Sequence, residues 1–284
     1  MGTLLCTTHI PTEAPSHLEA LAERGYTVIA GGVAASAASA LLLNVRRLHA
    51  ARRRAPDTEQ PFLNRGHDVL YNLQSEDAGF LHQFSRNTLV MEILCGLLND
   101  AYYKQIPPDR PNFVLRAMAA RSSGNSALPL HIDSFVPSSG RHCIACQVAI
   151  VLEDQSRETG CTLVVPGSHR SDEYAHQDAM SRAIPLETRA GDIVIWDGRL
   201  WHGALGNNTD RSRWSVIATF VRWWLKHNFD IPGTLPQSIY DALDDDEKTM
   251  LGYCSMPPRD EFDRIDIKAG HGQLKARVAD YGRR

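Results

Sequence analysis

The chain has 284 residues, 43% of them hydrophobic, which is enough for a sizeable core. Its 30 Lys and Arg against 33 Asp and Glu give a net charge of −3, which excludes the strongly basic surface typical of nucleic-acid-binding proteins. The uncharged stretch 28–45 consists mostly of small residues and is too weakly hydrophobic to predict a membrane span. Because no signal-peptide pattern is visible, we expect a cytoplasmic protein without a nucleic-acid or membrane partner.

The first third of the chain has the pattern of helices with one short strand. Apolar residues recur at helical spacing, and Gly25 and Pro56 mark the ends of segments. The expected elements are a helix over 13–23, a strand over 26–29, a helix over 33–54 and a helical region over 80–102.

From about residue 112 the sequence changes to short β-like runs separated by turn residues. Many short strands with regular turns predict a β-sandwich or jelly roll. Because the helices precede this block, the predicted class is α+β and not alternating α/β. Past Asp230 we expect a helical tail, with the acidic cluster 244–247 in the first turn of a helix. The expected strands are 113–118, 143–152, 162–165, 193–196 and 214–221.

His131 and Asp133 are separated by one residue, so both side chains share a face if the segment is a strand. A second histidine from another strand would complete two imidazoles and one carboxylate around a metal. That set is the facial triad of non-haem Fe(II) oxygenases. His202 follows an apolar run and a turn, and Gly203 beside it would permit close approach of a ligand or backbone.

Arg213 and Arg211 follow His202 at the start of the next predicted strand. The planar fork of arginine pairs bidentately with carboxylates, which suits the far end of a 2-oxo acid that chelates the metal. Period-two alternation puts both arginines on one face, so the spacing alone does not choose between them.

Several segments together resemble the phytanoyl-CoA dioxygenase family of Fe(II)- and 2-oxoglutarate-dependent oxygenases. Their order and spacing match the family over most of residues 18–225. The segments are Gly25-Tyr26-Thr27-Val28, Tyr71-Asn72-Leu73, Leu130-His131-Ile132-Asp133, Leu152-Glu153-Asp154, Glu158-Thr159-Gly160, Pro166-Gly167-Ser168-His169, Ala190-Gly191-Asp192, Trp201-His202-Gly203, Asn207 and Arg213.

The resemblance implies a double-stranded β-helix, a cupin-like jelly roll, with N-terminal helices packed outside. It implies one domain over 1–284. A mainly helical flank would cover 1–110, the jelly-roll core 111–225, and a tail that could act as a lid 226–284.

The resemblance also implies roles for single residues. His131, Asp133 and His202 would bind Fe(II), and Arg213 would pair with the tail of 2-oxoglutarate, with O2 as the second co-substrate. Thr162 and Asn72 look similar to positions near the co-substrate. To these we add Gln147, a buried amide that needs partners. We expect Phe135, Trp201 and Trp223 to line the substrate cavity, although such aromatics could equally belong to the core.

Two departures from the family pattern are visible. Many relatives carry Gln where this chain has Leu128, and Asn often stands where it has Thr159. Related halogenases replace the triad carboxylate with Gly or Ala, so Asp133 favours hydroxylation. His169 is interpreted as part of a turn motif and not as a fourth ligand.

The resemblance implies oxidation, most simply hydroxylation, of a small natural-product-type molecule, with release of succinate and CO2. One alternative is a non-redox cupin-like metal-binding protein or an inactive homologue, which would not need Arg213. Another is a zinc hydrolase on the same triad.

Six cysteines are spread along the chain, and Cys143 and Cys146 form a CxxC without a second copy. In a strand their thiols would point to opposite faces, so we interpret them as small buried hydrophobic residues and not as a zinc or redox site. Reduced thiols are expected.

Overall fold

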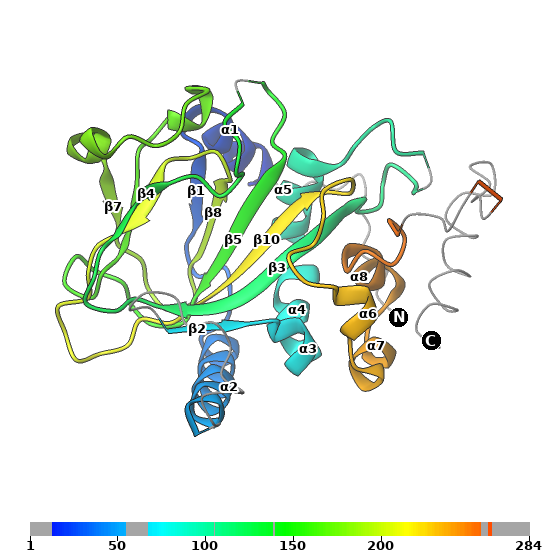
Figure 1. The fold of residues 1–284 in the computed structure, drawn as a ribbon, viewed down its shortest axis with the longest axis horizontal. Coiled ribbons are helices and arrows are strands. Elements are labelled where there is room, and N and C mark those ends of the chain that lie inside the picture. Colours follow the sequence, from blue (N-terminus) through cyan, green and yellow to red (C-terminus); the bar gives the residue numbers. More distant parts are fainter. Residues whose placement is uncertain (1–12, 55–67, 105, 139, 257–260, 263–284) are drawn as a thin grey trace. The chain divides into compact units, whose positions relative to one another are not determined.

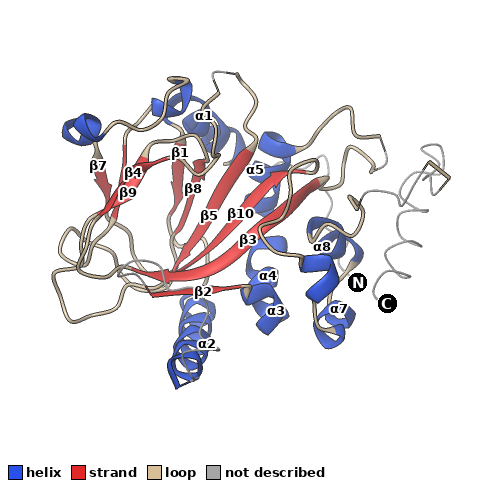
Figure 2. Ribbon diagram, in the orientation of Figure 1, coloured by secondary structure: helices blue, strands red, loops and turns tan. Residues whose placement is uncertain are grey.

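The computed structural model describes residues 13–54, 68–104, 106–138, 140–256 and 261–262. These residues form helices together with two antiparallel sheets (Figures 1 and 2). The helices are α1 (Ala14–Arg24), α2 (Ala35–Arg54), α3 (Leu73–Glu76), α4 (Ala78–Ser85), α5 (Thr88–Leu98), α6 (Ile231–Thr234), α7 (Gln237–Ala242) and α8 (Asp245–Met250). None of the helices in these ranges is long and apolar enough to cross a bilayer.

The larger sheet has six strands in the order β1-β8-β5-β10-β3-β2, and the smaller has four in the order β4-β9-β6-β7. The six strands are β1 (Tyr26–Ile29), β2 (Asp68–Tyr71), β3 (Phe113–Ser122), β5 (Ala145–Val151), β8 (Ile193–Asp197) and β10 (Ser215–Arg222). The four are β4 (Leu128–His131), β6 (Thr162–Val164), β7 (Ile184–Leu186) and β9 (His202–Ala204).

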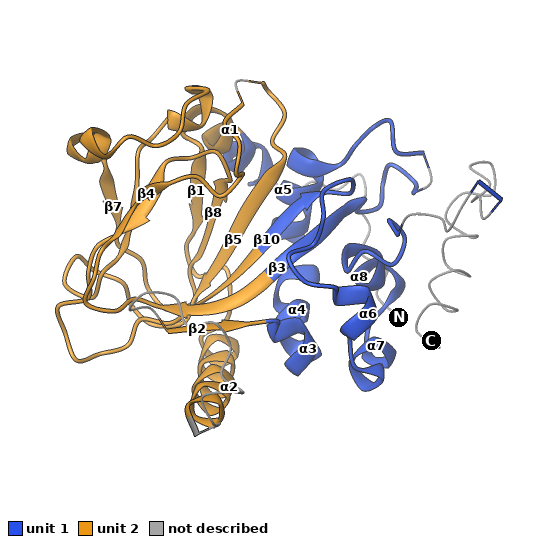
Figure 3. Ribbon diagram, viewed as in Figure 1, with its two compact units in different colours: residues 1–18, 72–117, 219–284 blue, residues 19–71, 118–218 orange. Residues whose placement is uncertain are grey.

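The chain divides into two compact units (Figure 3). One comprises residues 1–18, 72–117 and 219–284, and the other residues 19–71 and 118–218. Strands β3 and β10 each begin in one unit and end in the other. The single-domain organisation expected from the sequence stays a prediction.

The second unit contains the core between the two sheets. Side chains from the larger sheet, such as Tyr26 and Trp196, meet side chains from the smaller one, such as Val164 and Leu186. This packing of one sheet on another is the jelly-roll layer structure, and the expected α+β class with a jelly-roll core is confirmed. Strands β1 and β2 come from the predicted helical flank, so that flank also supplies edge strands to the larger sheet.

The first unit is mainly helical. Its aromatic core includes Phe220, whose ring lies 6.2 Å from that of Phe84 and 5.7 Å from that of Phe113. Helix α8 begins with a capping box, in which the Asp244 side chain accepts from the backbone of Glu247 and the Glu247 side chain accepts from the backbone of Asp244. The acidic cluster therefore lies at the start of a helix, as predicted.

Strand β10 ends at Arg222, and Trp223 and Trp224 lie in the turn that follows. Two sequence expectations need correction. Strand β5 begins only at Ala145, so alternation does not separate the CxxC thiols, and Cys143 and Cys146 share a side-chain hydrogen bond. Cys95 is disulfide-bonded, so the expectation of reduced thiols does not hold for it.

Candidate metal centre

The two histidines of the predicted triad lie opposite each other on neighbouring strands. His131 ends β4 and His202 begins β9, and the antiparallel register pairs them directly, with ring centroids 4.2 Å apart. The edge strand β4 is held from its open side by the amide of Gln177, which donates to Leu130 O at 2.9 Å and accepts from Leu130 N at 3.2 Å. Register pairing therefore puts both imidazoles on one face.

Each imidazole is oriented by a backbone carbonyl. His131 Nδ1 lies 2.9 Å from Pro129 O, and His202 Nδ1 lies 2.9 Å from Leu200 O. A carbonyl oxygen only accepts, so Nδ1 must carry the proton in both rings. The Nε2 lone pairs are then available to a metal, which is how outer hydrogen bonds prepare metal-binding histidines.

Asp133 completes the triad. Its Oδ2 lies 3.2 Å from His202 Nε2 and its Oδ1 lies 3.6 Å from His131 Nε2. One ligand atom from each residue can be chosen so that all three lie within 4.8 Å of one another. Atoms that share one ion at about 2.1 Å are separated by roughly 3 to 4 Å, so the three residues fit a single ion.

The charge of Asp133 suits a cation. Burial opposes ionisation of this carboxyl, but the neighbouring His202 and His131 outweigh it and hold the pKa of Asp133 well below its usual range. The carboxylate is thus ionised, and it lies beside the Nε2 atoms of His131 and His202, whose lone pairs can bind a metal. This donor set, with three ligands on one side of an ion, is the facial arrangement of non-haem iron sites.

The turn Asp197-Gly198-Arg199 holds the backbone of Asp133. Gly198 O accepts from Asp133 N at 2.7 Å and from Ser134 N at 2.9 Å, and Gly198 N donates to Ala145 O at 2.8 Å. A Cβ on Gly198 would lie 3.0 Å from the Ala145 Cβ, so glycine permits this close packing. Gly203 has a similar role, because a Cβ there would lie 2.5 Å from Leu128 O. The predicted close approach at Gly203 is therefore one between backbones.

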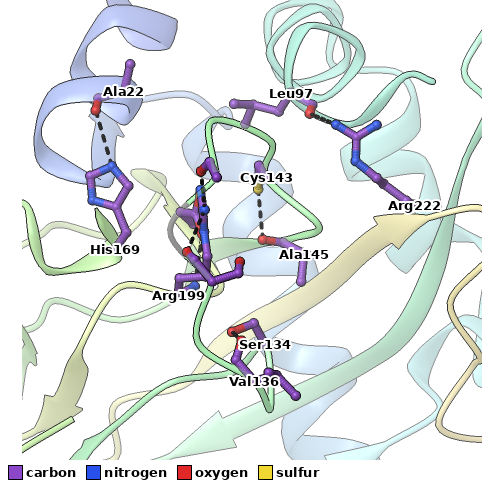
Figure 4. A network of polar contacts seen from close by, with 12 residues as sticks. Ala22, Leu97, Ser134, Val136, Cys143, Ala145, His169, Arg199 and Arg222 are labelled. Carbon is purple, nitrogen blue, oxygen red and sulfur yellow. Dashed lines mark hydrogen bonds and ion pairs between the residues drawn. The ribbon is translucent and has the colours of Figure 1, made fainter. Parts of the chain in front are cut away.

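Arg199 ties the same turn to the loop after Asp133 (Figure 4). Its guanidinium makes a two-point pair with Asp197, with Nε to Oδ1 at 2.9 Å and Nη2 to Oδ2 at 2.7 Å. Its Nη1 donates to Ser138 O at 3.1 Å and Gly140 O at 2.6 Å. Because Asp197 and Arg199 are both buried, this is a paired internal charge that positions the loop.

Substituting Arg199→Lys should loosen that loop while keeping the buried charge. A lysine ammonium cannot bridge Asp197 and two carbonyls with a planar fork. We expect faster backbone hydrogen exchange over residues 134–142 and metal affinity weakened by roughly tenfold, the lower end of the range for residues that support ligands. Hydrogen–deuterium exchange and a Co(II) titration measure the two effects. The exposed Arg211→Lys is the control, and unchanged exchange in Arg199→Lys would contradict this role.

Arg213 is buried just before β10 and is held from several sides. Its backbone N donates to Ser122 Oγ at 3.1 Å and its Nη1 donates to Gln155 Oε1 at 3.3 Å. Glu153 accepts from the flanking residues, from Ser212 Oγ at 3.0 Å and from Trp214 N at 2.8 Å.

Among the described residues, no carboxylate pairs with the guanidinium of Arg213. Its Nε is buried without a hydrogen-bond partner within the described ranges. Burial and the nearby Arg121 lower the pKa of Arg213 to about 10, so it stays cationic at neutral pH. An orphaned donor on a buried cation fits an anionic ligand. Arg211, by contrast, is exposed, which supports Arg213 as the better candidate.

Two further predicted residues face the inside of the jelly roll. Thr162 begins β6 and shares a face with Val164, a member of the inner cluster. Gln147 is paired with Trp196 across β5 and β8, and the Trp196 ring lies 5.4 Å from that of His202. Asn72 belongs to the other unit, where it precedes α3 with a left-handed backbone (φ 60°). Their co-substrate roles stay predictions.

The predicted substrate residues lie in different surroundings. Phe135 is 61% exposed two residues after Asp133, with a positive φ of 65°. Trp201 is buried with Leu130 and Val165, and its Nε1 donates to Glu173 O at 3.1 Å. Trp223 stacks on Tyr103 at 4.3 Å in the other unit. A role in substrate binding stays a prediction for all three.

Arg121 and Arg199 were missed by the sequence reasoning. For Arg121 the available signal was a charged residue at the end of an apolar strand. For Arg199 it was an Asp-Gly-Arg turn shortly before the predicted ligand His202. The surroundings of His169, in contrast, agree with the interpretation of this residue as structural. Its Nε2 lies 3.2 Å from Ala22 O (Figure 4), and burial lowers the pKa of His169, which favours the neutral ring.

The sequence profile described as phytanoyl-CoA dioxygenase (PhyH) matches residues 21–215. Among curated proteins, the chain is similar to dioxygenase af480 of Aspergillus fumigatus, with 30% identity over 133 residues, 45% of this chain and 43% of that one. It is also similar to phytanoyl-CoA dioxygenase 1 of Oryza sativa subsp. japonica, with 29% identity over 137 residues, 42% and 48% of the two chains. The chain thus spans less than half the length of either relative.

Solved structures show the same fold. The non-haem α-ketoglutarate-dependent epimerase SnoN from nogalamycin biosynthesis superimposes with a TM-score of 0.56 at 21% identity, covering 75% of this chain and 83% of that one. HygX from Streptomyces hygroscopicus, solved with nickel and 2-oxoglutarate bound, superimposes with a TM-score of 0.58 at 16% identity, covering 75% and 88%. At these identities the likeness supports the jelly-roll fold.

Proposed function

Because this chain belongs to the phytanoyl-CoA dioxygenase family, we propose that it is an Fe(II)- and 2-oxoglutarate-dependent dioxygenase that oxidises a small molecule. The proposal includes hydroxylation as the outcome, a natural-product-type substrate, a cytoplasmic location and no nucleic-acid partner. Two similar proteins support the proposal. Dioxygenase af480 is described as a dioxygenase, and SnoN acts in nogalamycin biosynthesis, which is the formation of a natural product.

The observation that carries this proposal is a buried arginine without a carboxylate, in the same unit as a His-Asp-His triad. A metal-binding protein without redox chemistry needs only the triad. Arg213 keeps an unpaired Nε inside the fold, which is costly unless a ligand binds there. A dicarboxylate that chelates the metal with one end and pairs with Arg213 at the other accounts for both features.

Each residue then has a physical task. His131, Asp133 and His202 would hold iron from one side, which leaves the remaining coordination positions to ligands. Arg213 would orient 2-oxoglutarate through its far carboxylate, since the neutral Gln155 leaves the charge of the guanidinium uncompensated. When bound, the iron and 2-oxoglutarate supply the activation of O2, with release of succinate and CO2.

The substrate side of the centre has apolar character. Phe135 and Val136 are both about 60% exposed, and they belong to the loop that follows Asp133 and that Arg199 holds. Large exposed apolar side chains next to a metal site favour contact with an organic substrate. We therefore propose that this loop covers part of the substrate.

The proposed function is tested by adding Fe(II) and 2-oxoglutarate to the full chain without oxygen. Chelation of iron by a 2-oxo acid should produce a weak visible charge-transfer band, and the band should saturate at one equivalent of each. Zn(II) in place of Fe(II) is the control and should give no band. A folded protein that binds Fe(II) but shows no band with 2-oxoglutarate would overturn the proposal.

A further inference from the structure

Arg121 is a second arginine close to the metal centre. It lies on β3 opposite Val69 of β2, and the next residue, Ser122, accepts the backbone N–H of Arg213 at 3.1 Å. The charge of Arg121 acts on His131 and on Arg213, and that of Asp133 acts on Arg121. Arg121 therefore lies within electrostatic reach of the triad and of the proposed co-substrate arginine.

Arg121 lacks the ion pair that other shielded arginines have. Arg199 pairs with Asp197, and Arg110 pairs with Asp246. Within the ranges that the structure describes, the side chain of Arg121 makes neither a hydrogen bond nor an ion pair, although it is only partly exposed. Burial lowers the pKa of Arg121 from its usual value. Such a cation is stabilised when an anion binds.

The proposed co-substrate does not use this charge. The two positive charges of Fe(II) and the one of Arg213 balance Asp133 and the two carboxylates of 2-oxoglutarate. Arg121 is then left as one excess positive charge beside a centre that is otherwise neutral. An excess charge of this kind attracts a further anion more strongly than it would in water, because the local dielectric is lower.

Arg121 is also on the accessible side of the triad. The side chains of His131 and Asp133 are 34% and 28% exposed, whereas that of His202 is only 7% exposed. Arg121 interacts with the two accessible ligands, and it is itself less buried than Arg213. Arg121 is therefore the more accessible of the two arginines to a molecule that comes from solvent.

We propose that Arg121 binds an anionic group, most simply a carboxylate, of the organic substrate, which makes that substrate a monoanion with an apolar body. The apolar part follows from Phe135 and Val136 on the loop beside Asp133. This inference rests on the proposed function, and it adds the charge class of the substrate. The rival role for Arg121 is a second contact to 2-oxoglutarate itself.

The test uses benzoate and benzamide, which share a shape and differ in charge. Each is titrated without oxygen into the full chain loaded with Fe(II) and 2-oxoglutarate, and the perturbation of the charge-transfer band is followed. We expect benzoate to bind at least about tenfold more tightly than benzamide, as charge-assisted hydrogen bonds require. Arg121→Gln should remove that preference, Arg121→Lys should keep part of it, and the affinity for 2-oxoglutarate should change less than about twofold.

Arg116→Gln is the matched control, because Arg116 lies five positions before Arg121 on β3 and an odd spacing on a strand puts it on the opposite face. It should keep the full preference for benzoate. Equal binding of benzoate and benzamide to the wild type would overturn the proposal, as would a preference that survives in a folded Arg121→Gln variant. If Arg121→Gln weakened the binding of 2-oxoglutarate, Arg121 would be assigned to the co-substrate instead. A wild-type protein without the band would refute the dioxygenase, whereas a normal band without the preference refutes only this subsite.

Discussion

His202→Ala and His131→Ala should each abolish turnover and strongly weaken Fe(II) binding. Both Nε2 atoms face the Asp133 carboxylate, at 3.2 Å from His202 and 3.6 Å from His131, so each substitution removes one of the three proposed ligands. Loss of a residue that merely supports a ligand typically costs roughly 10- to 100-fold in metal affinity. Loss of the ligand itself should exceed about 100-fold, as measured by anaerobic Fe(II) or Co(II) titration alongside succinate release.

His169→Gln separates metal binding from folding in this experiment. His169 is also buried, but its ring contacts a carbonyl of α1 and is outside the cluster of ligand atoms. We expect His169→Gln to lower the melting temperature and to keep its metal affinity. If His202→Ala retained full metal affinity in a folded protein, the triad would not be the metal site.

Arg213→Gln should weaken 2-oxoglutarate binding far more than metal binding. Removing one partner of a buried charge pair typically costs about 2 to 5 kcal/mol, which corresponds to at least about 30-fold in affinity. The Fe(II) affinity should stay within about twofold, because Arg213 is not one of the proposed ligands His131, Asp133 and His202. Titration of the charge-transfer band with 2-oxoglutarate measures the first effect, and metal titration the second.

The contribution of the far carboxylate can be isolated with 2-oxobutyrate, which lacks it. Wild type should bind 2-oxobutyrate weakly, and Arg213→Gln should bind it about as well as wild type does. Arg211→Gln is the matched control, since Arg211 is exposed two residues away. Should Arg211→Gln lose 2-oxoglutarate affinity while Arg213→Gln retains it, the assignment of Arg213 is wrong.

Much of the fold could be predicted because its elements have strong local signals. The spacing of apolar residues predicts α1 and α2 to within two residues, and the β-rich texture after residue 112 predicts most of the larger sheet. The short strands were harder. Strands β4, β7 and β9 have three or four residues each, so they exist through pairing with neighbours and carry almost no periodicity of their own.

The end of β10, just before Trp223 and Trp224, is also not set by the local sequence pattern. Phe220, Val221, Trp223 and Trp224 are all residue types that favour strands, yet β10 ends at Arg222. Trp223 is stabilised instead by stacking on Tyr103 and by a hydrogen bond to Asp100 at 3.2 Å. Contacts with residues more than 100 positions away decide where that strand stops, and no local pattern contains them.

The amino-acid sequence by itself determined which residues could bind a metal and a dicarboxylate, because His131, Asp133, His202 and Arg213 match a family pattern in type and spacing. Only the tertiary structure decided that Arg213 is buried while Arg211 is exposed, since strand alternation treats the two alike. It also brought Arg121 near the triad and left it without an ion pair within the described ranges. The physical reason is that the partners of a charge are set by long-range strand pairing and burial, which the order of residues along the chain does not reveal.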